Sequence, residues 1–450
     1  MNSLRSWLER LKHRPASGNE GQDQRHHEMR EALANCSGAD DWLTLSTDRN
    51  GFVREVAVRA LSDQPSSAAL VALLERANDW VPQVRELAVA GVWQYLRPEQ
   101  LTALLQALPA WLALARRQRT DHGPMLVAVR SVLQTVEVRA EVEATFLKQR
   151  GQVARFLFAL LQEASESSAA FLAKALAHSE ITVRQLAVEA CQALPAEQSV
   201  PLLLRALNLP GASVRVKALH GLLALLSDSR ELLRDALLEA SPTIRSLALW
   251  AAPRWRVDAR EVLNTRLKGN LPTLKREWLG VLGLARELGV DLDTTWQTMA
   301  WRSPCSSVRL AIVEGLADEQ LSDLLRALDD SSDKVFAKAL ERLRGQAWME
   351  IAPDLDARLD RDWHLLSPAR RQALMQVRPR WQQLAYLLRR LDACSDERNA
   401  WLALIGDWCR AQYAITDPVT SRSERERLVD RIRYLELCGD LPSGSATRLT

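Results

Sequence analysis

The sequence has few of the features that catalysis or metal binding requires. It contains no Walker loop, no GxGxxG entry from a strand, no HExxH and no GxSxG motif. Of its seven histidines, only those in His26-His27-Glu28 cluster with a second possible ligand, beside a polar stretch where chance composition explains them. We therefore expect no catalytic residues, no cofactor and no metal site.

Cysteine pairs and long apolar runs are also missing. The six cysteines are widely spaced without a CxxC pair, and most lie within apolar helical patterns, which favours buried, reduced thiols. No uncharged apolar run is long enough to span a bilayer, and the amino terminus lacks the apolar core of a signal peptide. These absences predict a soluble cytoplasmic protein.

Charge of one sign is not in excess. The 450 residues include 59 basic and 56 acidic side chains, for a formal net charge of +3. A nucleic-acid-binding protein usually carries a strong basic excess. The near balance therefore does not indicate a nucleic-acid-binding protein, and the length allows two or three ordinary domains or one extended array.

The sequence is instead rich in one short pattern. ITVRQLAVEA at residues 181–190 is followed by SVRVKALHGL and then by TIRSLALWAA, at intervals of about 30 residues. We call the aliphatic residue that aligns with the valine of ITVRQ the repeat valine, and it recurs at Val53, Val84, Leu126, Val153, Val183, Val214, Ile244, Leu274, Val308 and Val335. Self-similarity of this kind predicts an array of structural repeats.

The residues after each repeat valine predict a helix with one small-residue face. A cation follows in most copies, at Arg54, Arg85, Arg184, Arg215, Arg245, Lys275 and Arg309. Alanine is common four residues after the valine, and a small residue is common after seven, so these positions share one helical face. A second apolar helix precedes each copy across a turn rich in Asp, Ser and Pro. Such a helix–turn–helix unit buries its apolar stripe only against its neighbours.

The V-R-x-x-A-x-x-A-L pattern resembles the HEAT-repeat family, particularly the short bacterial form related to phycobilisome-lyase repeats, over roughly residues 40 to 345. The resemblance implies an all-α fold: a right-handed α-solenoid of about ten HEAT-like helix–turn–helix repeats. It also implies an aspartate before the valine that pairs with arginines of adjacent repeats. Asp48 and Asp79 match this habit, whereas Pro210, Pro242 and Pro304 depart from it. The copies at Leu126 and Val153 are degenerate.

An amphipathic helix is predicted at the amino terminus. Residues 1–14 place Leu4, Trp7, Leu8 and Leu11 on one face, with basic residues around them. We expect this helix either to cap the first repeat or to dock on a partner or an anionic membrane surface. Four such side chains support weak docking at most, so any membrane association would be peripheral.

The remaining segments follow from composition: a flexible tether at 15–27, the repeat array at 28–345, a C-terminal helical cap at 346–440 and a flexible tail at 441–450. The cap contains RRQALMQVRPRWQQLAYLLRRL, in which six arginines interleave with Trp381 and Tyr386. Nucleic-acid-binding proteins share this interleaving. Solvated arginines on a helix bundle are the favoured interpretation, because acidic residues are mixed nearby.

The predicted function is a non-catalytic scaffold or adaptor. In HEAT arrays the second helix of each repeat lines the concave surface, where positions two and six after the repeat valine should face outward. These positions are mostly charged in the early copies but become apolar or aromatic in the middle of the chain. Aromatic anchors dominate many protein interfaces. We therefore predict that a protein partner binds at Val216, His220, Trp250 and Trp255.

The main alternative is a nucleic-acid-binding HEAT-like protein, with DNA-repair glycosylase activity as its most specific form. That family is described as using aromatic residues and an aspartate, and the Asp-Trp dipeptide occurs at Asp41-Trp42, Asp79-Trp80, Asp362-Trp363 and Asp407-Trp408. An aspartate cap followed by a core tryptophan explains each pair without catalysis. HEAT-like hydroxylases pair several His-Glu motifs around iron, whereas this sequence has only His27-Glu28.

Overall fold

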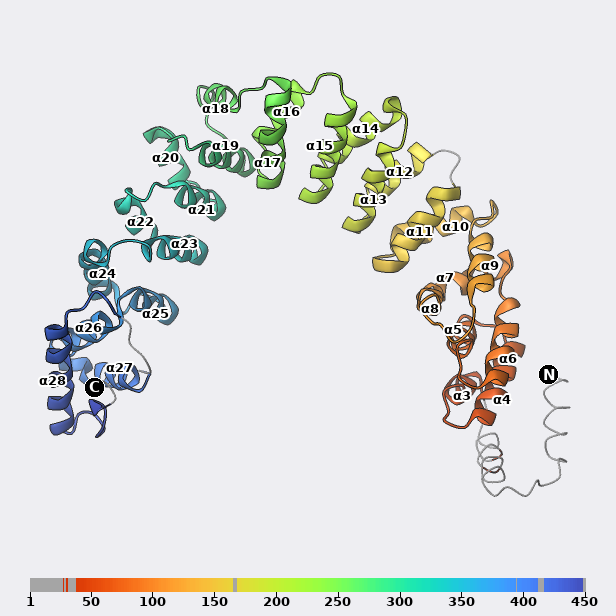
Figure 1. Ribbon diagram of the computed structural model, residues 1–450, viewed down its shortest axis with the longest axis horizontal. Coiled ribbons are helices and arrows are strands. Elements are labelled where there is room, and N and C mark those ends of the chain that lie inside the picture. The colour runs from red at the N-terminus through yellow and green to blue at the C-terminus, as the bar shows by residue number, and fades with distance from the viewer. Residues whose placement is uncertain are drawn as a thin grey trace. The chain divides into compact units, whose positions relative to one another are not determined.

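The computed structural model describes residues 27, 30, 38–164, 168–393, 395–411 and 417–447. Every regular element within these ranges is a helix, and none is a strand, which confirms the predicted all-α class. The chain divides into two compact units, Met1–Ser229 and Arg230–Thr450. Figure 1 shows the helices of each unit arranged in chain order.

The first unit contains helices of six to fourteen residues with short turns between most of them. They are α3 (Ala39–Leu45), α4 (Gly51–Asp63), α5 (Ser67–Arg76), α6 (Pro82–Trp93), η1 (Pro98–Gln100, a short 3₁₀ turn), α7 (Leu101–Gln106), α8 (Leu108–Leu114), α9 (Gly123–Leu133), α10 (Arg139–Lys148), α11 (Gly151–Ala164), α12 (Ser168–Leu176), α13 (Ile181–Gln192), α14 (Ala196–Leu207) and α15 (Ala212–Leu225).

The second unit is also built from helices joined by turns. Its helices are α16 (Arg230–Leu237), α17 (Pro242–Ala251), η2 (Ala252–Trp255), α18 (Ala259–Leu267), α19 (Lys275–Leu288), α20 (Thr294–Trp301), α21 (Ser306–Gly315), α22 (Leu321–Ala327), α23 (Asp333–Leu343), α24 (Trp348–Asp362), α25 (Pro368–Val377), α26 (Arg380–Ala393), η3 (Ser395–Glu397), α27 (Arg398–Arg410) and α28 (Arg422–Leu437).

Helices pack against their neighbours in the chain and against the next helix but one. In the first unit α4 packs on α6 and α13 packs on α15; in the second, α19 packs on α21 and α21 packs on α23. These contacts bury the repeat valines Val53, Val84, Val183, Val214, Ile244, Val308 and Val335. Each such side chain stabilises its unit by roughly 1.5–3 kcal/mol, while the small residues on the same face let the helices approach closely.

The repeat alignment predicted from the sequence is wrong at Leu274, whose side chain is 49% exposed. The reason is that α19 begins only at the next residue, so Leu274 is its N-cap and lies outside the helix. The two degenerate copies are shifted by one position. Met125 and Ala154 are buried there, whereas the aligned residues Leu126 and Val153 are half-buried.

The arginine after the repeat valine connects one repeat to the next. Arg54 of α4 is buried, and its guanidinium donates to both carboxylate oxygens of Asp79 at 2.9 Å. The same group donates to the backbone carbonyls of Asp48 at 2.8 Å and Arg49 at 3.0 Å. Asp79 precedes α6, so this ion pair joins α4 to the start of the following repeat helix. The pairing that the HEAT resemblance implies for Asp79 is therefore present.

The second unit has one pair in the same arrangement, since Asp330 precedes α23, and one variant, in which the carboxylate of Glu287 lies in the last turn of α19. Arg309 donates to both carboxylate oxygens of Asp330, at 2.6 and 2.9 Å, and Arg245 donates to those of Glu287 at 3.0 and 2.7 Å. Burial alone would raise the pKa of Asp330, but the bonds from Arg309 and from the Ser332 amide hold that pKa below its usual value. We call these three pairs, Arg54–Asp79, Arg245–Glu287 and Arg309–Asp330, the arginine clamps.

A second contact makes each clamp more rigid. The guanidinium also donates to the carbonyl six residues earlier, in Arg54, Arg245 and Arg309 alike. Arg184 differs, because its buried Nε has no hydrogen-bond partner among the described residues. The residue that corresponds to Asp79 in the next repeat is Leu209, which offers no carboxylate.

The residue five positions before the repeat valine also shapes the turn. Asp79 and Asp330 each accept a hydrogen bond from the amide two residues later, at 2.9 and 2.7 Å. The corresponding residue before Val183 is His178, whose Nδ1 accepts from the Glu180 amide at 3.0 Å and whose Nε2 lies 3.0 Å from the Phe146 carbonyl oxygen. His178 is thus a buried structural residue that replaces the usual aspartate.

Gly280 provides a test of how closely the helices pack. A Cβ atom at this position of α19 would lie 1.9 Å from the carbonyl oxygen of Leu238, which follows α16. Gly280→Ala should therefore lower the free energy of unfolding by about 1–3 kcal/mol, because the backbones must separate. Denaturant unfolding followed by circular dichroism measures this loss.

The matched control is Gly315→Ala in α21, where a Cβ meets no atom within 4 Å. Its stability should be unchanged or slightly higher, since alanine favours the helix. Equal denaturant concentrations at the unfolding midpoint for the two variants would contradict the close approach of α19 to Leu238.

Candidate partner-binding site

Two of the four predicted partner-binding residues lie in the second unit. Trp250, in the last turn of α17, is 73% exposed and makes no hydrogen bond or ring contact with other described residues. Trp255 ends η2 and is half-buried, with the Arg254 guanidinium 6.0 Å from its ring centroid. Trp250 is the most exposed tryptophan in the described part of the chain, so its ring is open to solvent.

The other two residues, Val216 and His220, lie on α15 of the first unit. Val216 is half-buried and His220 is exposed. Lys217, between them, forms an ion pair with Glu189 of α13. Positions two and six after the repeat valine are exposed or half-buried in the copies at Val53, Val84, Val183, Val214 and Ile244. The side chains named from the sequence are thus accessible, each within its own unit.

Half of the other described tryptophans are buried between helices. Buried rings include Trp111, Trp278, Trp296, Trp381, Trp401 and Trp408. Trp80 differs: it is 66% exposed, and the Arg54 guanidinium lies 5.3 Å from its ring centroid. The expectation that the tryptophan of each Asp-Trp pair belongs to the core is therefore wrong for Asp79-Trp80.

The aspartates of the Asp-Trp pairs have local partners. Asp79 belongs to an arginine clamp, and Asp41 accepts from the Gly38 amide at 2.9 Å at the start of α3. Asp362 pairs with Arg361, and Asp407 pairs with Arg410. These contacts make caps and ion pairs the physical role of the aspartates.

The basic and aromatic segment around residue 380 is occupied by internal contacts. Arg378 is buried, pairs with Asp356 and lies 4.2 Å from the ring centroid of Tyr386 and 5.3 Å from that of Trp348. Its burial lowers the pKa of the guanidinium. The interpretation of solvated arginines is therefore wrong for Arg378. Further arginines of the segment pair as Arg370–Asp333, Arg389–Asp360 and Arg390–Asp360.

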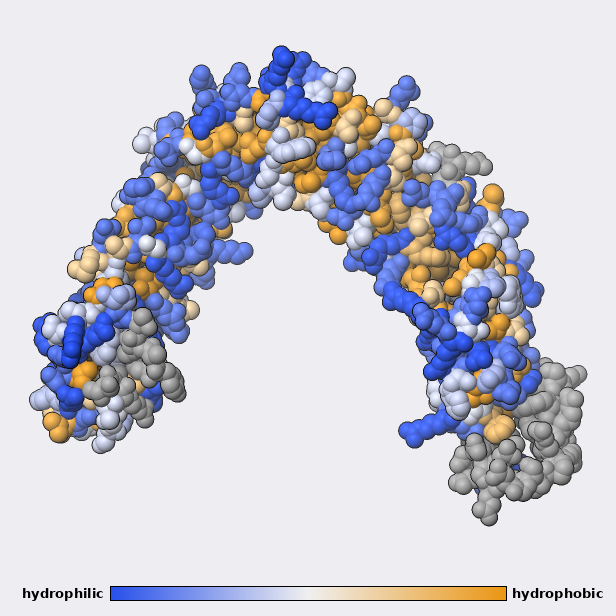
Figure 2. Space-filling view, viewed as in Figure 1, coloured by the Kyte–Doolittle hydropathy of each residue, from blue (hydrophilic) through white to orange (hydrophobic). Residues whose placement is uncertain are grey.

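Ion pairs also join successive repeats along the surface. Their members are 28 to 33 residues apart, about one repeat: Arg130–Glu163, Lys174–Glu143, Lys217–Glu189, Arg286–Glu314, Arg358–Asp329 and Arg389–Asp360. Exposed pairs of this kind add only about 0–1 kcal/mol each to stability. They neutralise cations that a nucleic-acid backbone would require. The surface in Figure 2 accordingly mixes hydrophilic and hydrophobic side chains over both units.

Reactive side chains are sparse in the described ranges. No group of three or more His, Cys, Asp or Glu residues there is placed to hold a metal ion. Burial raises the pKa of the Cys191 thiol to about 12, so it stays protonated at neutral pH and is a poor nucleophile or ligand. His27 is exposed, whereas His26 and Glu28 lie outside the described residues.

None of the described helices is both long and apolar enough to cross a bilayer. The predicted docking residues Leu4, Trp7, Leu8 and Leu11 lie outside the described residues, as does the predicted tether except for His27. Within the predicted C-terminal tail, Leu441 and Ala446 are buried, and the Ala446 amide donates to Glu436 at 2.8 Å.

The exposure of Trp250 leads to a direct prediction. Trp250→Ala should change the free energy of unfolding by less than about 0.5 kcal/mol, because the ring contacts little of the protein. Trp401→Ala, at a ring that is only 1% exposed, should cost about 3–5 kcal/mol. Denaturant unfolding measures the free energy of unfolding of both variants. An equal decrease in the two variants would identify Trp250 as a packing residue.

No protein-family model and no curated protein sequence matches this chain. The resemblance to HEAT repeats consequently rests on the recurring residues themselves and on the way in which their helices pack within each unit.

Proposed function

We propose that this chain is a non-catalytic scaffold or adaptor that binds a protein partner. In this proposal the helices form a right-handed α-solenoid of about ten HEAT-like repeats, with residues 346–440 as the C-terminal cap. Three features support it: the buried repeat valines, the packing of several helices on the next helix but one, and the arginine clamps. Arrays of this kind offer extended binding surfaces.

The observation that carries the proposal is the exposed ring of Trp250. Tryptophan is enriched at the interface positions that dominate affinity. In the solenoid the second helices line the concave surface. Val216, His220, Trp250 and Trp255 would then contact the partner there.

The proposal assigns no reaction to the chain. The aspartates of the Asp-Trp pairs are held in a clamp, a cap and ion pairs, and the buried Cys191 stays protonated. The chain would act in the cytoplasm, which the free thiols of Cys191, Cys305, Cys409 and Cys438 support. Any membrane contact would be peripheral, through residues 1–14.

The test compares partner capture by the full chain with capture by two variants. Trp250→Ala should weaken capture of the specific partner at least tenfold in quantitative mass spectrometry, since loss of an interface anchor costs about 2 kcal/mol or more. Trp93→Ala is the matched control, because Trp93 is also exposed, at the end of α6. Equal capture of the partner by wild type and by Trp250→Ala would contradict the proposal.

Salt dependence separates a protein partner from a nucleic acid. Capture of the protein should persist between 50 and 200 mM salt. Binding to a fluorescent DNA duplex that falls by a factor of about 10³–10⁵ over this range would instead support the nucleic-acid alternative. Fluorescence anisotropy measures that binding directly.

A further inference from the structure

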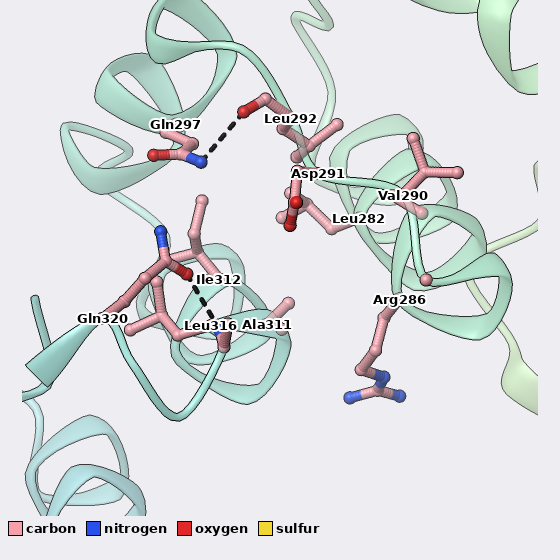
Figure 3. A pocket seen from close by; sticks show the side chains of 14 residues that line it. Leu282, Arg286, Val290, Asp291, Leu292, Gln297, Ala311, Ile312, Leu316 and Gln320 are labelled. Atoms are coloured by element: carbon pink, nitrogen blue, oxygen red, sulfur yellow. Dashed lines mark hydrogen bonds between the residues drawn. The ribbon is translucent and has the colours of Figure 1, made fainter.

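The second unit contains a small hollow whose lining combines apolar side chains with a carboxylate. It has a volume of about 230 Å³ and lies between the end of α19, the chain at 289–292 and the end of α21 (Figure 3). Sites for cofactors and drug-sized ligands usually enclose roughly 300–1,000 Å³. The hollow is therefore better suited to a single side chain.

Two turns fix the shape of this hollow. Gly289 adopts a left-handed conformation (φ 61°) that ends α19, and the Val290 amide then donates to the Ala285 carbonyl at 2.9 Å. The chain reverses at this point and brings Asp291 to the rim. On the side of α20, Gln297 donates to the Leu292 carbonyl at 2.9 Å. On the side of α21, Gln320 accepts from the Ala317 amide at 2.8 Å.

The floor of the hollow is apolar and the rim carries one free carboxylate. Leu282, Ile312 and Leu316 are buried and line it. Asp291 is exposed, and Figure 3 shows its carboxylate directed toward the space between Leu282 and Ile312. That carboxylate makes no hydrogen bond or ion pair with any other described residue. Arg286 points away from the hollow and pairs with Glu314.

We propose that this hollow binds a lysine side chain of the protein partner, an inference that rests on the proposed scaffold function. A lysine carries a compact charge at the end of a four-carbon stem. The stem would lie against the apolar floor while the ammonium reaches the rim, as lysines do on other amphipathic surfaces. There it would donate a charge-assisted hydrogen bond to the Asp291 carboxylate.

The probe is N-acetyl-lysine N-methylamide, titrated into the full chain with labelled Leu and Ile methyl groups. We expect saturable NMR shifts at the methyl groups of Leu282, Ile312 and Leu316. The same compound with an acetylated ε-amine keeps the stem but loses the charge. It should bind at least about tenfold more weakly, because a hydrogen bond between charged groups is lost.

Two variants remove the two features separately. Asp291→Asn keeps the shape and removes the charge, whereas Gly315→Leu keeps the charge and fills space, since a Cβ at Gly315 meets no atom within 4 Å. Each should weaken lysine binding at least about tenfold. Glu319→Gln is the control, because Glu319 is an exposed carboxylate nearby that does not line the hollow.

Absence of shifts with the lysine probe, or equal binding to wild type and Asp291→Asn, would overturn the inference. So would equal binding of the charged and acetylated probes. The titration needs neither the natural partner nor Trp250, so its failure leaves the capture experiment intact. Conversely, if wild type and Trp250→Ala capture the partner equally well, a positive lysine titration still shows that the hollow binds lysine.

Discussion

The arginine that follows the repeat valine carries its charge into the protein interior in the three clamps. A charge taken out of water is stable only when its hydrogen bonds are saturated and its counter-ion is in place. Arg54 meets this requirement only if the Asp79 carboxylate of the following turn and the Asp48 carbonyl oxygen both lie within hydrogen-bonding distance of its guanidinium. The clamps Arg245–Glu287 and Arg309–Asp330 impose the same condition in the second unit. Apolar packing brings the helices together, and the clamps define their register.

This arrangement has a consequence for the surface. Ion pairs between successive repeats engage some of the basic and acidic side chains on the described surface, such as Lys217 with Glu189 and Arg286 with Glu314. The ring of Trp250 and the carboxylate of Asp291 are two exposed groups without an internal partner among the described residues. In the proposed scaffold function these exposed groups would contact a partner, and anchors held on well-packed helices would lose little conformational entropy on association.

Part of this could be predicted from the sequence. The buried face of α4 and α13 follows from the 0, 4, 7 spacing of Val53, Ala57 and Ala60 and its copies, since that spacing is a property of any helix. The exposure of Leu274 could not be predicted, because it depends on where α19 starts. The partner of Arg245 is Glu287, 42 residues away, which no fixed repeat spacing indicates. The four Asp-Trp pairs look alike in the sequence, although tertiary packing leaves Trp80 exposed and buries Trp408.

A double-mutant cycle on Arg54 and Asp79 measures whether the clamp couples one repeat to the next. The variants are Arg54→Met, Asp79→Leu and the combination of both, each measured by denaturant unfolding. Each single replacement leaves a buried charge without its partner and should cost about 3–5 kcal/mol, while the double replacement should cost clearly less than the sum. A coupling energy of at least about 1.5 kcal/mol is the predicted result. Losses that add to within about 0.5 kcal/mol would show that the two side chains do not act as one unit.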